Sequence, residues 1–260
     1  MYSAAVLATA AVVVRPGVGR SDVIRARSAG PLRVMSPRHA GRAAWIVTSS
    51  LGGGLVDGDD VALEIDIEAG ATCVVTTQAS TKVYRGRTRQ ALTVRVHGDA
   101  TALVVPDPVA PYRDAHFTQR TAIDLAPAAS LVLVDMLTAG RVAHGERWDA
   151  AAIDTTLLVT RAGVPLLRDR VRLDPAGGRV AARMRGCDAL ATVILLGPRF
   201  AALPATHAAR HPAVLAAQSP LGDGVLHRLA GSVADVTAAT RALARDACAL
   251  VGEDPWARKW

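Results

Sequence analysis

One short pattern recurs every 29 residues in the first half of the chain: the end of a β-strand, a turn of small residues, and an apolar run. The turns lie within residues 67–72, 96–101 and 125–130. Such regular spacing is typical of a solenoid, whose repeats are strand pairs that stack and bury a shared apolar face. We therefore expect a mainly β fold of layered or stacked β-sheets, built from solenoid-like strand pairs, with a few helices mostly in the C-terminal third.

Alternation of apolar and polar residues identifies individual strands. Residues 60–68 place Val and Ile or Leu on one face and mostly acidic residues on the other, which indicates a strand with one buried face. After a turn at Ala69-Gly70, residues 73–77 continue the pattern, and we predict that the two segments form a hairpin. Residues 156–160 and 164–173 predict another hairpin, which breaks the 29-residue period.

In the last third of the chain the sequence pattern changes from β-strands to a mixture of strand, loops and helix. Residues 191–196 are uniformly apolar and predict a buried strand, whereas residues 198–218 predict a short helix with loops. Ser232 has an acidic residue three positions later and begins an amphipathic pattern that ends near Gly252, so we predict a helix there. The apolar face of this helix is a stripe formed by Val236, Ala239, Leu243, Ala247 and Leu250. We expect a single domain over residues 1–260, β-rich to residue 197 and mixed, partly helical, from 198 to 260.

Composition excludes several classes of protein. Half of the residues are hydrophobic and 20% are charged, which excludes disorder as the dominant state. Aromatic residues make up only 3%, so the chain has few stacking platforms for single-stranded nucleic acid. The net charge of +7 comes from arginines that are interleaved with acidic residues. This dispersion favours a solvated surface, or one that meets an acidic protein, over a nucleic-acid patch.

Cysteine usage and the N-terminal residues indicate the compartment. Three cysteines stand far apart without a CxxC pair, which is typical of a reducing cytosol. The apolar residues 4–14 are too few to span a bilayer and lack the features of a signal peptide. We expect them to form the first strand of a cytoplasmic protein that does not bind membranes.

No catalytic motif occurs in the sequence, so we expect no enzymatic activity and no tightly bound cofactor. Gly52-Gly53-Gly54 lacks the GK[ST] ending of a phosphate loop. His207 and His211 are four residues apart and could share a metal on one helix face, although a surface helix is the favoured interpretation. Asp59 and Glu146 occupy turn-like positions, where capping and a transient divalent-ion site have the same appearance in a sequence.

Residues 76–85 form the most distinctive polar segment. Small and hydroxylated residues lead directly from a buried strand into Lys82, Tyr84 and Arg85. Loops held by a rigid scaffold often carry function, and this one predicts a polar lip for an anion, a saccharide or a protein. The residue types do not discriminate among these ligands.

This segment resembles the TTQxxTKVYR motif of the UreD (UreH) family of urease accessory proteins. Gly53–Asp59 is similar to the family's GGLVGGD, with Asp57 in place of a glycine that tolerates positive φ. Further similarities lie, in the family's order, at residues 30–34, 106–112, 138–141 and 145–148. The motifs that carry the resemblance lie within residues 30 to 175. The C-terminal third resembles the family only in its general sequence character, without a matching motif.

The resemblance implies a non-enzymatic scaffold for urease maturation. Members of this family bind UreF, bind the GTPase UreG through UreF, and also bind the urease apoprotein. Together these proteins deliver nickel to the urease active site, and a water-filled tunnel in UreD is thought to carry the ion. Hydroxyls and isolated carboxylates suit such transient transport of Ni²⁺, because a Cys/His cage would retain the ion.

The motif positions supply candidate site residues. Asp59, Thr81 and Glu146 are candidates for a transient nickel conduit, with turn capping or a salt bridge to Arg141 or Arg147 as the alternative. The partner-binding surface or tunnel lip is expected at Thr77, Gln78, Thr81, Lys82, Tyr84 and Arg85. A β-solenoid enzyme or binding protein acting on a polysaccharide or nucleic acid is the alternative function, and it would require an extended aromatic and carboxylate groove.

Overall fold

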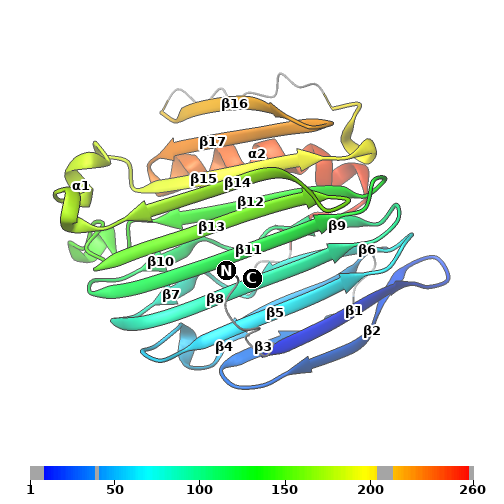
Figure 1. Ribbon diagram of the computed structural model, residues 1–260, viewed down its shortest axis with the longest axis horizontal. Coiled ribbons are helices and arrows are strands. Elements are labelled where there is room, and N and C mark those ends of the chain that lie inside the picture. The colour runs from blue at the N-terminus through cyan, green and yellow to red at the C-terminus, as the bar shows by residue number, and fades with distance from the viewer. Residues whose placement is uncertain (1–8, 39–40, 204–212, 258–260) are drawn as a thin grey trace.

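The computed structural model describes residues 9–38, 41–203 and 213–257, and these residues form two stacked β-sheets and a long helix (Figure 1). The smaller sheet has seven strands. In spatial order they are β14 (Val164–Leu173), β13 (Ala152–Arg161), β11 (Ala115–Leu125), β8 (Gly86–Val96), β5 (Asp60–Ile67), β1 (Ala10–Pro16) and β2 (Ser21–Ser28).

The larger sheet has ten strands and carries the long helix α2 (Val233–Leu250) on its outer face. Its strands in order are β16 (Leu215–Leu221), β17 (Gly224–Gly231), β15 (Ala189–Leu196), β12 (Ser130–Thr138), β9 (Thr101–Val104), β6 (Thr72–Thr77), β4 (Ala44–Ser50) and β3 (Leu32–Met35). Off this path, β10 (Val109–Pro111) pairs with β12, and β7 (Thr81–Val83) pairs with β10. The shorter helices are η1 (Leu51–Gly53), η2 (Val142–His144), η3 (Pro175–Gly177), α1 (Val180–Arg183) and η4 (Pro198–Phe200).

The 29-residue spacing is confirmed as one full turn of the chain around the two sheets. In the smaller sheet, β5, β8 and β11 are parallel, and Asp60 pairs with Arg89. In the larger sheet, β6, β9 and β12 are parallel, and Thr72, Thr101 and Ser130 lie side by side. Each turn therefore contributes one long strand to the smaller sheet and one main strand to the larger sheet, where β7 and β10 are additional short strands. Equivalent residues of successive turns stack directly on one another.

The hairpin predicted for residues 60–68 and 73–77 is wrong. β5 pairs with β1 and β8 in the smaller sheet, whereas β6 pairs with β4 and β9 in the larger one. The turn at Gly70 thus carries the chain from one sheet to the other. A period of two shows which face of a strand is buried but does not show which strand is its hydrogen-bonded partner, and here both buried faces point into the space between the sheets.

Antiparallel strands complete both sheets at their edges. β13 and β14 form the second predicted hairpin, which is confirmed. The predicted buried strand at residues 191–196 is confirmed as part of β15. In the region predicted as a short helix with loops, η4 is a short 3-10 helix and β16 begins at Leu215, while His207 and His211 lie outside the described residues.

The C-terminal helix is confirmed and packs against β12, β15 and β17. The Ser232 hydroxyl accepts a hydrogen bond from the backbone N–H of Asp235 at 3.1 Å, as expected for an N-cap. Val236 and Leu243 are buried as predicted, but Leu250 is 51% exposed. A seven-residue repeat drifts around a straight helix by about 20° per heptad, so the last member of the stripe no longer faces the sheet. Within the described residues, no helix has the length and apolarity needed to cross a membrane.

The apolar core falls into three parts. One cluster lies under α2. Two others lie between the sheets: one contains Ile65, Ile123 and Leu133, and the other contains Phe117 and Leu137. Gln119 and Asp135 stand between these two clusters along β11 and β12, so a polar layer interrupts the apolar interior.

Candidate functional site

The polar layer crosses several strands at one level of the stack. In the smaller sheet, Gln90, Gln119 and Thr155 are register partners on β8, β11 and β13. In the larger sheet, Asp135 on β12 is the register partner of Thr192 on β15. These five residues line cavities between the sheets. Gln90 and Gln119 occupy equivalent inward positions of two successive turns, and Thr155 extends the layer onto the next strand.

Two cavities meet at this layer. The larger, of about 190 Å³, reaches the surface at the exposed residues Gln78, Ala79 and Ser80. The smaller, of about 40 Å³, extends past Thr155 and Thr192. Gln119 and Asp135 line both cavities.

A hydrogen bond joins the two sheets where the cavities meet. The amide Nε2 of Gln119 donates to the carboxylate Oδ1 of Asp135 at 3.1 Å. Gln119 is 6% exposed. Burial raises the pKa of the Asp135 carboxyl, an effect that the Gln119 hydrogen bond opposes and the negative charge of Asp169 reinforces. Asp135 is therefore a half-buried carboxylate in contact with cavity space.

An ion pair links the sheets near the smaller cavity. Asp169 on β14 lies 3.2 Å from the guanidinium of Arg228 on β17. Its side chain is 15% exposed, whereas that of Arg228 is 50% exposed. This pair provides a second polar connection between the sheets, beyond Asp135 and Thr192.

The predicted lip divides into two groups. Thr77, Gln78 and Thr81 line the larger cavity. The hydroxyl of Thr77 donates to the Asp107 carboxylate at 3.1 Å and accepts from the Asp107 backbone N–H at 2.8 Å, which holds the ends of two successive turns together. Asp107 lines the cavity as well.

Lys82, Tyr84 and Arg85 do not line either of these cavities. The ring of Tyr84 instead packs edge-on against Tyr112, with 5.3 Å between ring centroids. The guanidinium of Arg141 lies over Tyr112, 4.5 Å from the ring centroid. Tyr84 therefore belongs to an aromatic and arginine cluster at the corner of the stack.

Glu146 and Asp59 have local partners. Arg141 donates from Nε to the Glu146 carboxylate at 3.0 Å and makes a second contact through Nη2. This hydrogen bonding holds the pKa of Glu146 below its usual value. The Asp59 carboxylate accepts from the Val56 backbone N–H at 2.8 Å, as in a turn cap. Both contacts match the salt-bridge and capping alternatives, and neither residue lines the two cavities.

The glycine-rich turn accommodates Asp57 without positive φ. The left-handed conformation falls on Gly58, with φ +87°. The Asp57 carboxylate accepts from the Arg87 backbone N–H at 2.7 Å. Gly86 leaves the space for it, because a Cβ at that position would lie 2.4 Å from the Asp57 side chain.

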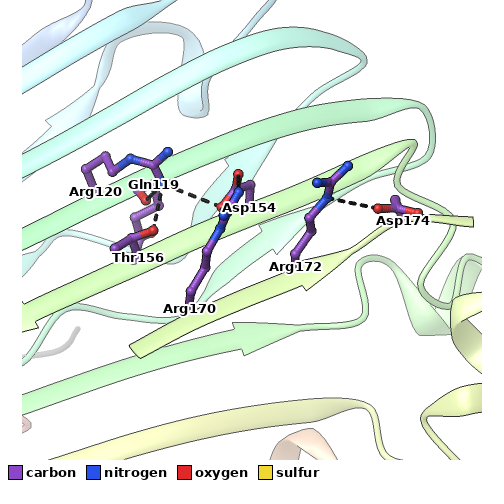
Figure 2. A network of polar contacts seen from close by, with 7 residues as sticks. All are labelled: Gln119, Arg120, Asp154, Thr156, Arg170, Arg172 and Asp174. Carbon is purple, nitrogen blue, oxygen red and sulfur yellow. Dashed lines mark hydrogen bonds and ion pairs between the residues drawn. The ribbon is translucent and has the colours of Figure 1, made fainter. Parts of the chain in front are cut away.

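The outer face of the seven-stranded sheet carries a ladder of ion pairs (Figure 2). The Arg170 guanidinium donates to both Asp154 oxygens, at 2.9 and 2.6 Å, and Arg120 lies 3.5 Å from the same carboxylate. The Arg170 hydrogen bonds lower the pKa of Asp154. Gln119 and Arg120 are adjacent on β11 and point to opposite faces, so the ladder is separate from the polar layer.

Gln119 and Asp135 are absent from the candidates that the sequence suggests. The sequence signal that could have identified them is a polar residue at an inward position of a mostly apolar strand. The inward residues of β11 are Ala115, Phe117, Gln119, Thr121, Ile123 and Leu125. Asp135 similarly interrupts the apolar run of β12. Among the described residues, no group of three or more His, Cys, Asp or Glu residues could hold a metal ion. Oxygen ligands spaced along the cavities are what this interior offers to a cation.

Comparison with known proteins agrees with the motif resemblance. A family model described as "UreD urease accessory protein" matches residues 7–260. A Urease accessory protein UreD of Sorangium cellulosum is 40% identical over 252 residues, which covers 93% of this chain and 81% of that protein. The UreD of an Anaeromyxobacter species is 40% identical over 95% of this chain and 91% of its own length, and Urease accessory protein D of Arabidopsis thaliana is 37% identical over 75% and 69%. The chain belongs to the UreD family of urease accessory proteins.

Proposed function

We propose that this chain is a non-enzymatic scaffold that acts with UreF and UreG to deliver nickel to the urease apoprotein. Membership of the accessory-protein family supports a role in urease maturation. The observation that carries the nickel proposal is the cavity of about 190 Å³ between the sheets, which connects a surface loop with a buried polar layer. No catalytic step by this chain is needed, because nickel is its cargo.

The proposed route enters at the Thr77–Thr81 loop and follows the cavity to Asp135. Hydroxyl, amide and carboxylate oxygens line it, including those of Thr77, Asp107 and Gln90. A conduit requires ligands that bind a cation strongly enough for entry and weakly enough for release. Isolated oxygen ligands satisfy this requirement better than clustered thiolates and imidazoles, which retain transition metals.

Partners are proposed from the family. UreF would contact this chain directly, UreG would act through UreF, and the urease apoprotein would receive the ion. The arginine-rich surface suits acidic protein partners. We place this function in the cytoplasm, where cysteines such as Cys73 and Cys248, which are free here, persist as thiols.

Buried aromatic residues argue against the alternative of a polysaccharide- or nucleic-acid-binding solenoid. Trp45, Trp148, Phe117 and Phe200 are all buried, so their rings are not available to a surface groove. Stacking on exposed rings is the usual basis of single-stranded nucleic-acid binding. The accessory-protein proposal has no such requirement.

The test is complementation. Cells that produce urease and its other accessory proteins, but lack UreD, would receive this chain, and the nickel content and activity of purified urease would be measured. We expect both to rise, and we expect the chain to copurify with UreF. A chain that leaves urease without nickel and does not associate with UreF or urease would overturn the proposal.

Asp59 and Glu146 remain proposed conduit residues that this assay also tests. Asp59→Ala and Glu146→Ala would be compared for nickel loading at equal recovery of the complex. Reduced loading in an intact complex would support a conduit role. Normal loading in both variants would leave them with the capping and ion-pair roles that their contacts show.

A further inference from the structure

The two cavities between the sheets share three lining residues, and two of them, Gln119 and Asp135, are joined by a contact between the sheets. Gln119 projects from β11 and Asp135 from β12, and the hydrogen bond between them is 3.1 Å long. Both residues line the larger and the smaller cavity. The contact therefore lies where the two cavities meet, on the direct route of an ion from one to the other.

We propose that the Gln119–Asp135 hydrogen bond is a closed gate, which a divalent cation opens by replacing the Gln119 amide as the partner of the Asp135 carboxylate. The inference rests on the proposed function and adds the point at which passage is controlled. It assigns two roles: Asp135 attracts and briefly holds the cation, and Gln119 keeps the carboxylate occupied when no cation is present.

The chemistry of the two side chains suits such an exchange. The closed state uses the NH₂ group of the Gln119 amide as a donor to a carboxylate oxygen. Rotation of the terminal amide by about 180° presents its carbonyl oxygen instead, because the two ends of the amide have nearly the same shape. A side chain that first donates to the carboxylate can then offer an oxygen to the cation that replaces it.

The surroundings also favour brief occupancy by a cation. Asp169 lies on β14 and adds negative charge near Asp135, and Arg228 on β17 pairs with Asp169. Thr155 and Thr192 offer hydroxyls in the smaller cavity, beyond the gate. With one carboxylate and neutral oxygens, the site provides fewer strong ligands than a permanent metal site requires.

Two substitutions separate the roles and predict opposite results. Asp135→Asn preserves size and can still accept the Gln119 hydrogen bond, but it has no charge for the cation. Gln119→Ser is too short to reach Asp135 and leaves the carboxylate free. In the complementation assay at limiting nickel, we expect Asp135→Asn to reduce the nickel content of urease on the order of tenfold. We expect Gln119→Ser to load nickel as well as the unmodified chain or better.

Matched controls are available outside the cavities. Asp124→Asn makes the same change on the exposed face of β11, and Gln218→Ser makes the same change on the exposed strand β16. Both are expected to load nickel normally. Copurification with UreF, measured for every variant, shows that the scaffold is intact, and nickel content is compared per amount of assembled complex.

The outcomes distinguish the gate from the function on which it rests. If the unmodified chain does not restore nickel loading, the proposed function fails. If the unmodified chain restores loading and Asp135→Asn does so equally well, only the gate is overturned. An assembled Gln119→Ser complex that loses loading to the same extent as Asp135→Asn also overturns the gate, because both residues would then be needed for passage itself.

Discussion

The carboxylate of Glu253 accepts a hydrogen bond from the indole Nε1 of Trp45 at 3.0 Å, although 208 residues separate them in the chain. The other carboxylate oxygen accepts from the backbone N–H of Ala43 at 2.9 Å. Glu253 is buried and lies shortly after α2, which ends at Leu250. The residues after the C-terminal helix are thereby tied to β4 and to the apolar cluster under α2, which includes Ala43 and Trp45.

Replacing Glu253 should therefore destabilise the protein. Glu253→Ala leaves two buried N–H groups without these acceptors, at a cost of about 2–4 kcal/mol in the free energy of unfolding. Urea denaturation followed by circular dichroism measures the loss. Glu68→Gln is the control, because Glu68 pairs with Arg15 on the surface and its replacement should lower the stability much less than Glu253→Ala does. Equal midpoints for the two variants would contradict the tether.

Asp135→Asn should have the opposite effect on stability. Because burial raises the pKa of Asp135 in the folded state, the folded state holds its proton more tightly than the unfolded state. That stabilising contribution is complete below the unfolded pKa of about 3.9 and is lost as the pH rises through the folded pKa. At neutral pH the variant should be more stable than the unmodified protein, and the difference should vanish below about pH 4. Denaturation midpoints measured across this pH range test the prediction, and a variant less stable at pH 7 would refute it.

Asp57 and Gly86 should behave as a coupled pair. Gly86→Ala places a Cβ 2.4 Å from the Asp57 side chain at a backbone position with φ +114°. We expect a loss of about 3 kcal/mol or more in the free energy of unfolding. Asp57→Gly alone removes the hydrogen bond to Arg87 and should cost about 1 kcal/mol.

The double variant tests the coupling directly. Removing the Asp57 side chain relieves the contact but not the positive φ, so the double variant should lose less than the sum of the single losses. Additive losses would show that the two residues do not compete for the same space.

Arg141→Met should produce a pH-dependent loss of stability. Glu146 is 8% exposed at its side chain and would keep its contact with the Arg113 backbone N–H, so we expect a loss of stability at pH 7. The Arg141 hydrogen bond lowers the folded pKa of Glu146, so its contribution is present above the unfolded pKa of about 4.3 and is lost as the pH falls through the folded pKa.

The difference between Arg141→Met and the unmodified protein should thus shrink below about pH 5. Thermal unfolding across this range measures it. Arg89→Met is the matched control, because the Arg89 side chain is 73% exposed and lies 3.6 Å from Asp60. A loss independent of pH would assign the effect to packing on Tyr112 rather than to charge.

The 29-residue periodicity predicted the stacked β-sheets, because the signals that define each repeat lie close together in the sequence. Each 29-residue turn carries its own small-residue corner and its own inward-facing residues, so the register of β5, β8 and β11 was predictable from spacing. The β13–β14 hairpin and the cap at Ser232 rest on equally local signals. Gly53 lines the same cavity as Thr77, Gln78 and Thr81, a proximity that neither motif predicts.

The partner of each strand was not predictable in this way. β5 and β6 have the alternation of a hairpin, yet the turn at Gly70 sends them to different sheets. Which inward polar residues meet across the gap depends on how the two sheets are superposed. Asp135 and Gln119 are 16 residues apart, on the two strands that flank one corner, and only the stacking of the sheets brings their side chains together.

The 29-residue spacing, the inward apolar faces and the family motifs thus determined a stacked β scaffold of the UreD family from the sequence alone. The tertiary structure decided that Glu146 and Asp59 have local partners and that Asp135 faces two cavities. The physical reason is the range of the interactions. Strand alternation, turns and caps are set by neighbours along the chain, whereas a cavity is the space that two independently formed sheets leave between them.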